Sequence, residues 1–240
     1  MSGQVRGAAA ELLRHLAPRQ CKVTLSLDGT AERDWIDAAR HDPAGHELAI
    51  LAGKHWYSVD NHRGRFAEQL SQGIQHAQAA GCTPTTLALP AGHLAEHLDL
   101  LVKHGISAVR TTRTARPRGL AAWWRAWRSA TPCTAAPHAL RWGLWEFDGS
   151  LSLVQHGLRR TLKAVSGAAA TGGLAHVAID LERLAAQGPS GWKLLDRTLE
   201  HVARLREQKT IEAQTVSAVA AQLVRTRHSS PARSILRPAA

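Results

Sequence analysis

The chain has 240 residues, of which 44% are hydrophobic, and carries a formal net charge of +11 at pH 7. It is long enough to bury a substantial core, and single α/β barrels commonly reach this length, so one main domain is expected. No apolar run approaches the roughly 18 residues of a membrane-spanning helix. Three widely spaced cysteines exclude a disulfide framework and favour a cytoplasmic location.

The positive charge is concentrated in one internal interval. No acidic residue lies between Asp99 and Glu146, whereas that interval holds Lys103 and seven arginines. Two interpretations stay open: contact with an anionic polymer or a membrane surface, and a solvated basic loop. Nucleic acid is a weaker candidate partner, because no helix-turn-helix or RNA-binding signature accompanies the charge.

Strand and helix patterns alternate along the first half of the chain. Residues 1–20 are predicted to form an N-terminal helical extension. Apolar runs bounded by turn residues predict strands at 21–27, 47–51, 85–89 and 106–109. Helical spacing between them predicts helices at 31–40, 64–80 and 94–104.

The alternation breaks at 111–140 and then returns. The interruption contains Trp123, Trp124 and Trp127 among arginines; these predict either the apolar face of a packed helix or a platform for ligand stacking. Further elements are predicted at 157–165 (helix), 174–179 (strand), 192–208 (helix), 211–214 (strand) and 215–224 (helix, with Thr215 as N-cap). Residues 225–240 are predicted to be a disordered basic tail. Such alternation implies a mostly parallel sheet, either open or closed into a barrel.

One segment carries a motif with metal-ligand spacing. Residues 45–56 read Gly-His-Glu-Leu-Ala-Ile-Leu-Ala-Gly-Lys-His-Trp, with the second histidine nine positions after the first. Residues 86–110 add a strand, a proline turn, a helix and a strand ending in arginine, and residues 174–223 add a histidine-bearing strand followed by helices. Together these segments resemble the polysaccharide deacetylases of the NodB-homology, carbohydrate esterase family over roughly residues 21–224.

The resemblance implies a distorted, incomplete (β/α) barrel within residues 21–224 and a known chemistry. In that family a divalent metal such as zinc activates water, a carboxylate removes its proton, and a histidine protonates the leaving amine. Matched to the family pattern, the catalytic residues are Asp28, His176 and Asp180, the metal ligands are Asp28 and His55, and the substrate-binding residues are Trp56, Pro90 and His93. His176 and Asp180 lie an even number of positions apart, so on one strand both would face the same side.

This sequence departs from the family pattern at several of those positions. Leu51 replaces the first metal-binding histidine, Gly29 follows Asp28 in place of an acid, Ala91 replaces an arginine, and Asp180 stands where the catalytic histidine is expected. Only 17 residues separate Asp28 from His46, which leaves room for one helix, so one strand-helix unit of the barrel is missing. A barrel that lacks a unit must re-close or cover an exposed edge.

Two functions are therefore predicted as competitors. The first is a divergent, catalytically impaired polysaccharide deacetylase-like protein of bacterial surface-polysaccharide metabolism, with an N-acetylated glycan as partner. If active, it would be a metal-dependent carbohydrate deacetylase. The alternative is a non-enzymatic module that docks an anionic polymer, a membrane surface or a protein through the basic Trp/Arg segment, residues 110–128.

Overall fold

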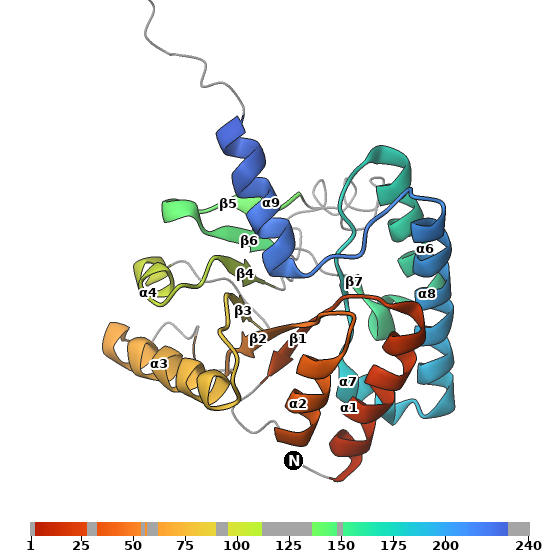
Figure 1. Ribbon diagram of the computed structural model, residues 1–240, viewed down its shortest axis with the longest axis horizontal. Helices are drawn as coiled ribbons and strands as arrows, with labels where there is room; N and C mark the ends of the chain where they lie inside the picture. The colour runs from red at the N-terminus through yellow and green to blue at the C-terminus, as the bar shows by residue number, and fades with distance from the viewer. Residues whose placement is uncertain are drawn as a thin grey trace, which may run out of the picture.

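The computed structural model describes residues 3–27, 33–53, 56, 62–89, 96–111, 136–147 and 151–229 (Figure 1). Its main sheet runs in the order β1-β2-β3-β4-β6-β5. The strands are β1 (Thr24–Leu27), β2 (Glu47–Leu51), β3 (Thr86–Ala88), β4 (Ala108–Arg110), β5 (His138–Ala139) and β6 (Trp145–Phe147). All neighbouring pairs are parallel apart from β5 and β6. The predicted α/β class with a mostly parallel sheet is confirmed.

A second, smaller sheet stands beside the first. It consists of β7 (Leu151–Ser152) paired in parallel with β8 (Val177–Ala178). Within the described ranges neither strand pairs with the main sheet, so the barrel is not closed. This agrees with the distorted, incomplete barrel that the sequence predicts.

The helices α3 (Arg63–Ala79) and α4 (Leu98–Lys103) cover one face of the main sheet. Phe66 and Leu70 of α3 and Leu101 of α4 are fully buried against Leu87 and Ile50 of the strands. Helix α9 (Val216–Ser229) lies across β4 and β6 on the opposite face, where Ala220 packs with Ala108 and Phe147 (Figure 1). The sheet is thus a middle layer, with α3 and α4 on one face and α9 on the other.

The β1 end of the sheet is covered by a separate helical cluster. It contains α1 (Gly3–Leu16), α2 (Arg33–His41), α7 (Leu181–Ala186) and α8 (Pro189–Glu207). Leu16, Leu184 and Leu195 are completely buried there together with Leu25 of β1. Helix α6 (Leu153–Thr171) packs on α8. This cluster packs against Leu25 of β1, the strand at one edge of the open main sheet.

Several element boundaries agree with the sequence patterns. The strand at 47–51 is confirmed, and α3 begins and ends one residue earlier than predicted. Between β1 and β2, the described residues 33–46 contain one helix, α2. Thr215 caps α9 as predicted, since its Oγ1 accepts a hydrogen bond from the amide of Ala218 at 3.3 Å. None of the described helices is long and apolar enough to cross a membrane.

Other elements differ from the prediction. The strand predicted at 211–214 is wrong, because the chain there forms no ladder and leads directly into α9. Helix α9 itself continues to Ser229, beyond the predicted end of its helix at 224. The short β6, β7 and α7 have no counterpart among the predicted elements.

Candidate functional site

Four strands end in one row of side chains. Leu51 of β2 pairs with Ala88 of β3, Ala88 with Arg110 of β4, and Arg110 with Phe147 of β6. Neighbouring residues in register point to the same face of a sheet, so these four side chains share the face on which Phe147 meets α9. In barrel enzymes the carboxyl ends of the strands carry the active site. We call this set the carboxyl-end row.

His176 joins the row from the segment just before β8. Its backbone oxygen accepts a hydrogen bond from the amide of Leu151 at 2.8 Å, and its ring lies edge-on to Phe147 with centroids 6.5 Å apart. The residue is half-buried, but its Nδ1 is fully buried and has no hydrogen-bond partner within the described chain. Burial, assisted by the positive charge of Arg110, lowers the pKa of His176 to about 4. The imidazole is therefore neutral at pH 7.

Arg110 supplies the charge of this row. It is the last residue of β4, and burial lowers the pKa of its guanidinium from the ordinary value. An arginine nevertheless stays protonated at neutral pH in proteins. The described part of the site thus combines a fixed positive charge with a neutral imidazole among apolar side chains.

A second polar cluster lies on the opposite face of the same strands. Glu146 is 1% exposed; its Oε1 accepts a hydrogen bond from Thr111 Oγ1 at 2.9 Å, and its Oε2 lies 2.7 Å from His138 Nε2. In the sequence, Glu146 stands out only as the end of the acid-free interval. Its position between the aromatic residues Trp145 and Phe147 is the sequence signal that could have indicated a buried carboxylate with polar partners.

Four of the predicted site residues, Asp28, His55, Pro90 and His93, lie outside the described residues. So does the basic Trp/Arg segment except for Arg110 and Thr111, and docking through it stays a prediction. Asp28, His55, Pro90 and His93 also remain predictions as site residues.

Trp56 is placed by packing. Its ring stands edge-on to Phe66 with centroids 6.1 Å apart, and the residue is half-buried. A Cβ added to Gly53 would lie 3.1 Å from the indole, and one added to Gly73 would lie 3.3 Å from it. Two glycines therefore make room for this side chain above α3. Any contact of Trp56 with substrate would use the part of the ring that remains exposed.

Asp180 is engaged at the start of α7. Its Oδ1 accepts a hydrogen bond from the amide of Arg183 at 3.1 Å, and its Oδ2 lies 3.2 Å from the Arg183 Nε. The strand β8 already ends at Ala178, so the alternation that would bring Asp180 beside His176 does not extend to it. Asp180 is exposed and acts as a helix N-cap in this structure.

The described donors do not fit a divalent metal. Across the described ranges, no three histidine, cysteine, aspartate or glutamate side chains gather closely enough to hold an ion. Leu51 occupies its place in the carboxyl-end row as an apolar side chain.

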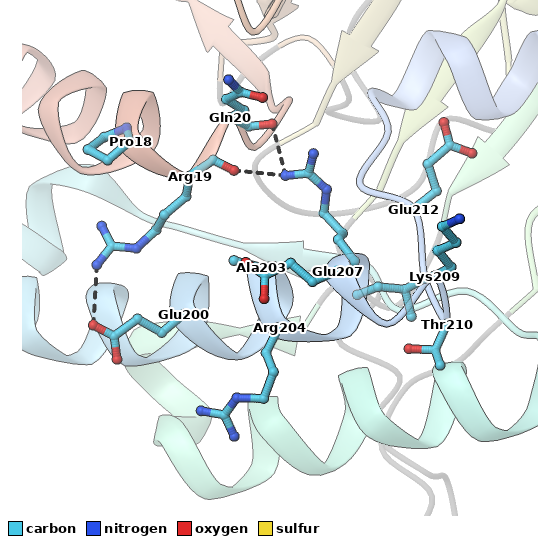
Figure 2. Close-up of a pocket in the computed structure, with 12 residues that line it drawn as sticks. Pro18, Arg19, Gln20, Glu200, Ala203, Arg204, Glu207, Lys209, Thr210 and Glu212 are labelled. Atoms are coloured by element: carbon cyan, nitrogen blue, oxygen red, sulfur yellow. Dashed lines mark hydrogen bonds and ion pairs between the residues drawn. The ribbon is translucent and has the colours of Figure 1, made fainter.

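A groove of about 1060 Å³ lies beside the turn that precedes β1 (Figure 2). Its walls come from residues 18–20, the second half of α8 and residues 209–212. Arg206 donates to the backbone oxygens of Arg19 and Gln20 at 2.8 and 3.0 Å, and Arg19 pairs with Glu200 at 3.3 Å. These bonds fasten the turn after α1 to α8. The groove carries charges of both signs and shares no lining residue with the carboxyl-end row.

Comparisons with known proteins bear on the fold. No family model matches the chain, and no curated protein matches it. Among solved structures it is similar to the crystal structure of a putative polysaccharide deacetylase from Mycobacterium smegmatis, with a TM-score of 0.69 and 17% identity. The match covers 99% of this chain and 83% of that one. This chain therefore has the polysaccharide deacetylase type of fold that its motifs predict.

Proposed function

We propose that this chain is a divergent polysaccharide deacetylase-like protein that binds a glycan at the carboxyl ends of its strands and is impaired in hydrolysis. The proposal is supported by the fold it shares with the Mycobacterium smegmatis structure and by the site residues described above. We place it in bacterial surface-polysaccharide metabolism, with a cytoplasmic location suggested by its cysteines. The ancestral reaction would be metal-dependent N-deacetylation of an amino sugar.

The proposed impairment of hydrolysis rests on the protonation state of His176. Amide hydrolysis needs an acid that gives a proton to the leaving amine, and a group with a pKa near working pH does this best. Burial and Arg110 lower the pKa of His176 to about 4, so almost none of it is imidazolium at neutral pH. Asp180, the other predicted group on this segment, is bound to the first turn of α7. The acid that the reaction requires is thus lacking among the described members of the predicted set.

The proposal separates binding from hydrolysis, and both can be measured on one sample. The purified chain is mixed with N-acetylated oligosaccharides with and without added Zn²⁺, and acetate release and binding heat are recorded. We expect measurable binding and acetate release no greater than that of the His55→Ala variant. Zn²⁺-dependent release that His55→Ala abolishes would show that the enzyme is intact. A lack of binding to every glycan tested would remove the carbohydrate part of the proposal.

A further inference from the structure

The Arg110–His176 pair contains a buried polar atom that nothing in the described fold satisfies. His176 Nδ1 has no hydrogen-bond partner within those residues. Leaving a buried donor or acceptor unpaired costs about 1–3 kcal/mol. The fold could have avoided this cost with an apolar side chain against Phe147, as it does with Leu51 and Ala88 in the same row. An unpaired nitrogen kept at the carboxyl ends of parallel strands points to a ligand that pairs with it.

The charge of the site decides the chemical class of that ligand. The guanidinium of Arg110 lies close enough to His176 to oppose its protonation, so the same field repels any other cation. An oxyanion is attracted instead, and guanidinium groups bind carboxylate and phosphate oxygens with their planar fork of donors. Five N–H donors allow Arg110 to keep its present interaction and still bind an anion.

We propose that Arg110 and His176 together bind an oxyanion of the ligand at the ends of β4 and β6. The guanidinium donates to one or two oxygens, and the His176 imidazole donates from Nδ1 to the same group. The source that best fits this fold is the carboxylate of an acidic sugar, and that part rests on the proposed function. The oxyanion part rests on Arg110 and His176 alone.

The test follows the His176 ring by NMR in the full chain. Its resonance is assigned as the one missing from His176→Asn, and it is titrated with pH in the presence of sodium glucuronate, sodium phosphate or neutral glucose. An anion bound beside the ring favours the imidazolium, so glucuronate should raise the pKa of His176 from about 4 by about 1 or more. Glucose should leave it unchanged. If phosphate raises the pKa of His176 and glucuronate does not, the oxyanion site is supported and the acidic sugar is overturned as its source.

Variants of Arg110 show whether the response comes from this pair. Arg110→Gln should abolish the response to anions, whereas Arg110→Lys, which keeps the charge but lacks the fork, should retain part of it. Arg63→Gln is the matched control, because Arg63 pairs with Asp99 on the exposed start of α3. The proposal is overturned if no anion moves the His176 resonance, or if Arg110→Gln responds as the unaltered chain does. These probes are monosaccharides and inorganic ions. A chain that fails to bind N-acetylated oligosaccharides, against the proposed function, can therefore still show the oxyanion site in this test.

Discussion

Two polar side chains at opposite ends of the main sheet, Glu47 and His176, differ in how fully they are hydrogen-bonded. At the amino end, Glu47 of β2 accepts hydrogen bonds from Thr24 Oγ1 at 2.7 Å, Thr86 Oγ1 at 2.5 Å and the amide of Ser217 at 3.0 Å. At the carboxyl end, His176 Nδ1 is buried without a partner among the residues described, beside the charge of Arg110. The Glu47 carboxylate thus has three donors, whereas His176 Nδ1 has no partner among the described residues.

We infer from this difference that the amino end stabilises the fold and that the carboxyl end holds the proposed ligand site. Glu47 links two neighbouring strands to the first turn of α9, where a carboxylate also meets the positive end of the helix dipole. Barrel folds commonly keep stability at the amino ends of their strands and chemistry at the carboxyl ends. The same division is proposed for this chain, although its barrel is open and Leu51 stands where the family has a metal-binding histidine. The substitutions below measure it at each end.

The largest effect is expected from Glu47→Ala. The change leaves the hydroxyls of Thr24 and Thr86 and the amide of Ser217 without their acceptor, and Thr86 is completely buried. Hydrogen bonds to charged groups contribute about 1.5–3 kcal/mol each and are not additive, so we expect a loss of about 3 kcal/mol in the free energy of unfolding. Urea denaturation at pH 7 measures it.

Glu68→Ala is the matched control for that substitution. Glu68 is an exposed glutamate of α3 that accepts one hydrogen bond, from Gln72 Nε2 at 3.3 Å. Surface changes of this kind usually cost less than about 0.5 kcal/mol. Similar losses in the free energy of unfolding for the two variants would mean that the hydrogen bonds of Glu47 stabilise the fold no more than a surface contact does.

The sequence predicted the regular part of the fold well, for a physical reason. Period-2 and period-3.6 apolar patterns are local, and they identified β1 to β4 and the helices between them. The strand predicted at 211–214 is wrong: this segment joins no ladder and leads into α9, whose first amides are bonded to distant side chains. The amides of Val216 and Ser217 donate to Thr24 and Glu47, which are far away in the sequence.

The resemblance predicted His176 as a site residue on a strand, and its role stays a prediction. In the structure His176 lies just before β8, and its contact with Phe147 and its proximity to Arg110 depend on distant segments that local patterns do not reveal. β6 was not predicted because its central Glu146 reads as a surface residue unless its partners are known.

The second largest effect concerns His176 and is visible only on lowering the pH. The folded pKa is about 4 and the ordinary value is 6.5, so the unfolded chain binds more protons between these values. Stability carried by the neutral ring is therefore present at pH 7 and lost as pH falls from 6.5 to 4. We expect the unaltered chain to lose about 3 kcal/mol more than His176→Phe between pH 7 and pH 4.

Chemical denaturation at the two pH values compares the two proteins. His176→Phe keeps an aromatic ring against Phe147, and His76→Phe, on the exposed surface of α3, controls for the loss of one imidazole. Burial also lowers the pKa of His46, opposed by Asp42, so His176→Phe should keep a smaller pH dependence. Equal pH dependence in all three proteins would place the His176 ring in water and end the case for an unsatisfied nitrogen.

The smallest effect is expected at Asp180, and it decides whether this residue belongs to the site. If Asp180 is only the N-cap of α7, Asp180→Ala removes one capping bond and costs about 1 kcal/mol. The exposed ion pair with Arg183 adds little to that. Asp180→Ser keeps a capping oxygen and should restore most of the stability, as measured by urea denaturation, while both variants bind glycans as before. A normally stable Asp180→Ser protein that no longer binds glycan would instead assign Asp180 to the carboxyl end, because serine preserves the cap but removes the charge.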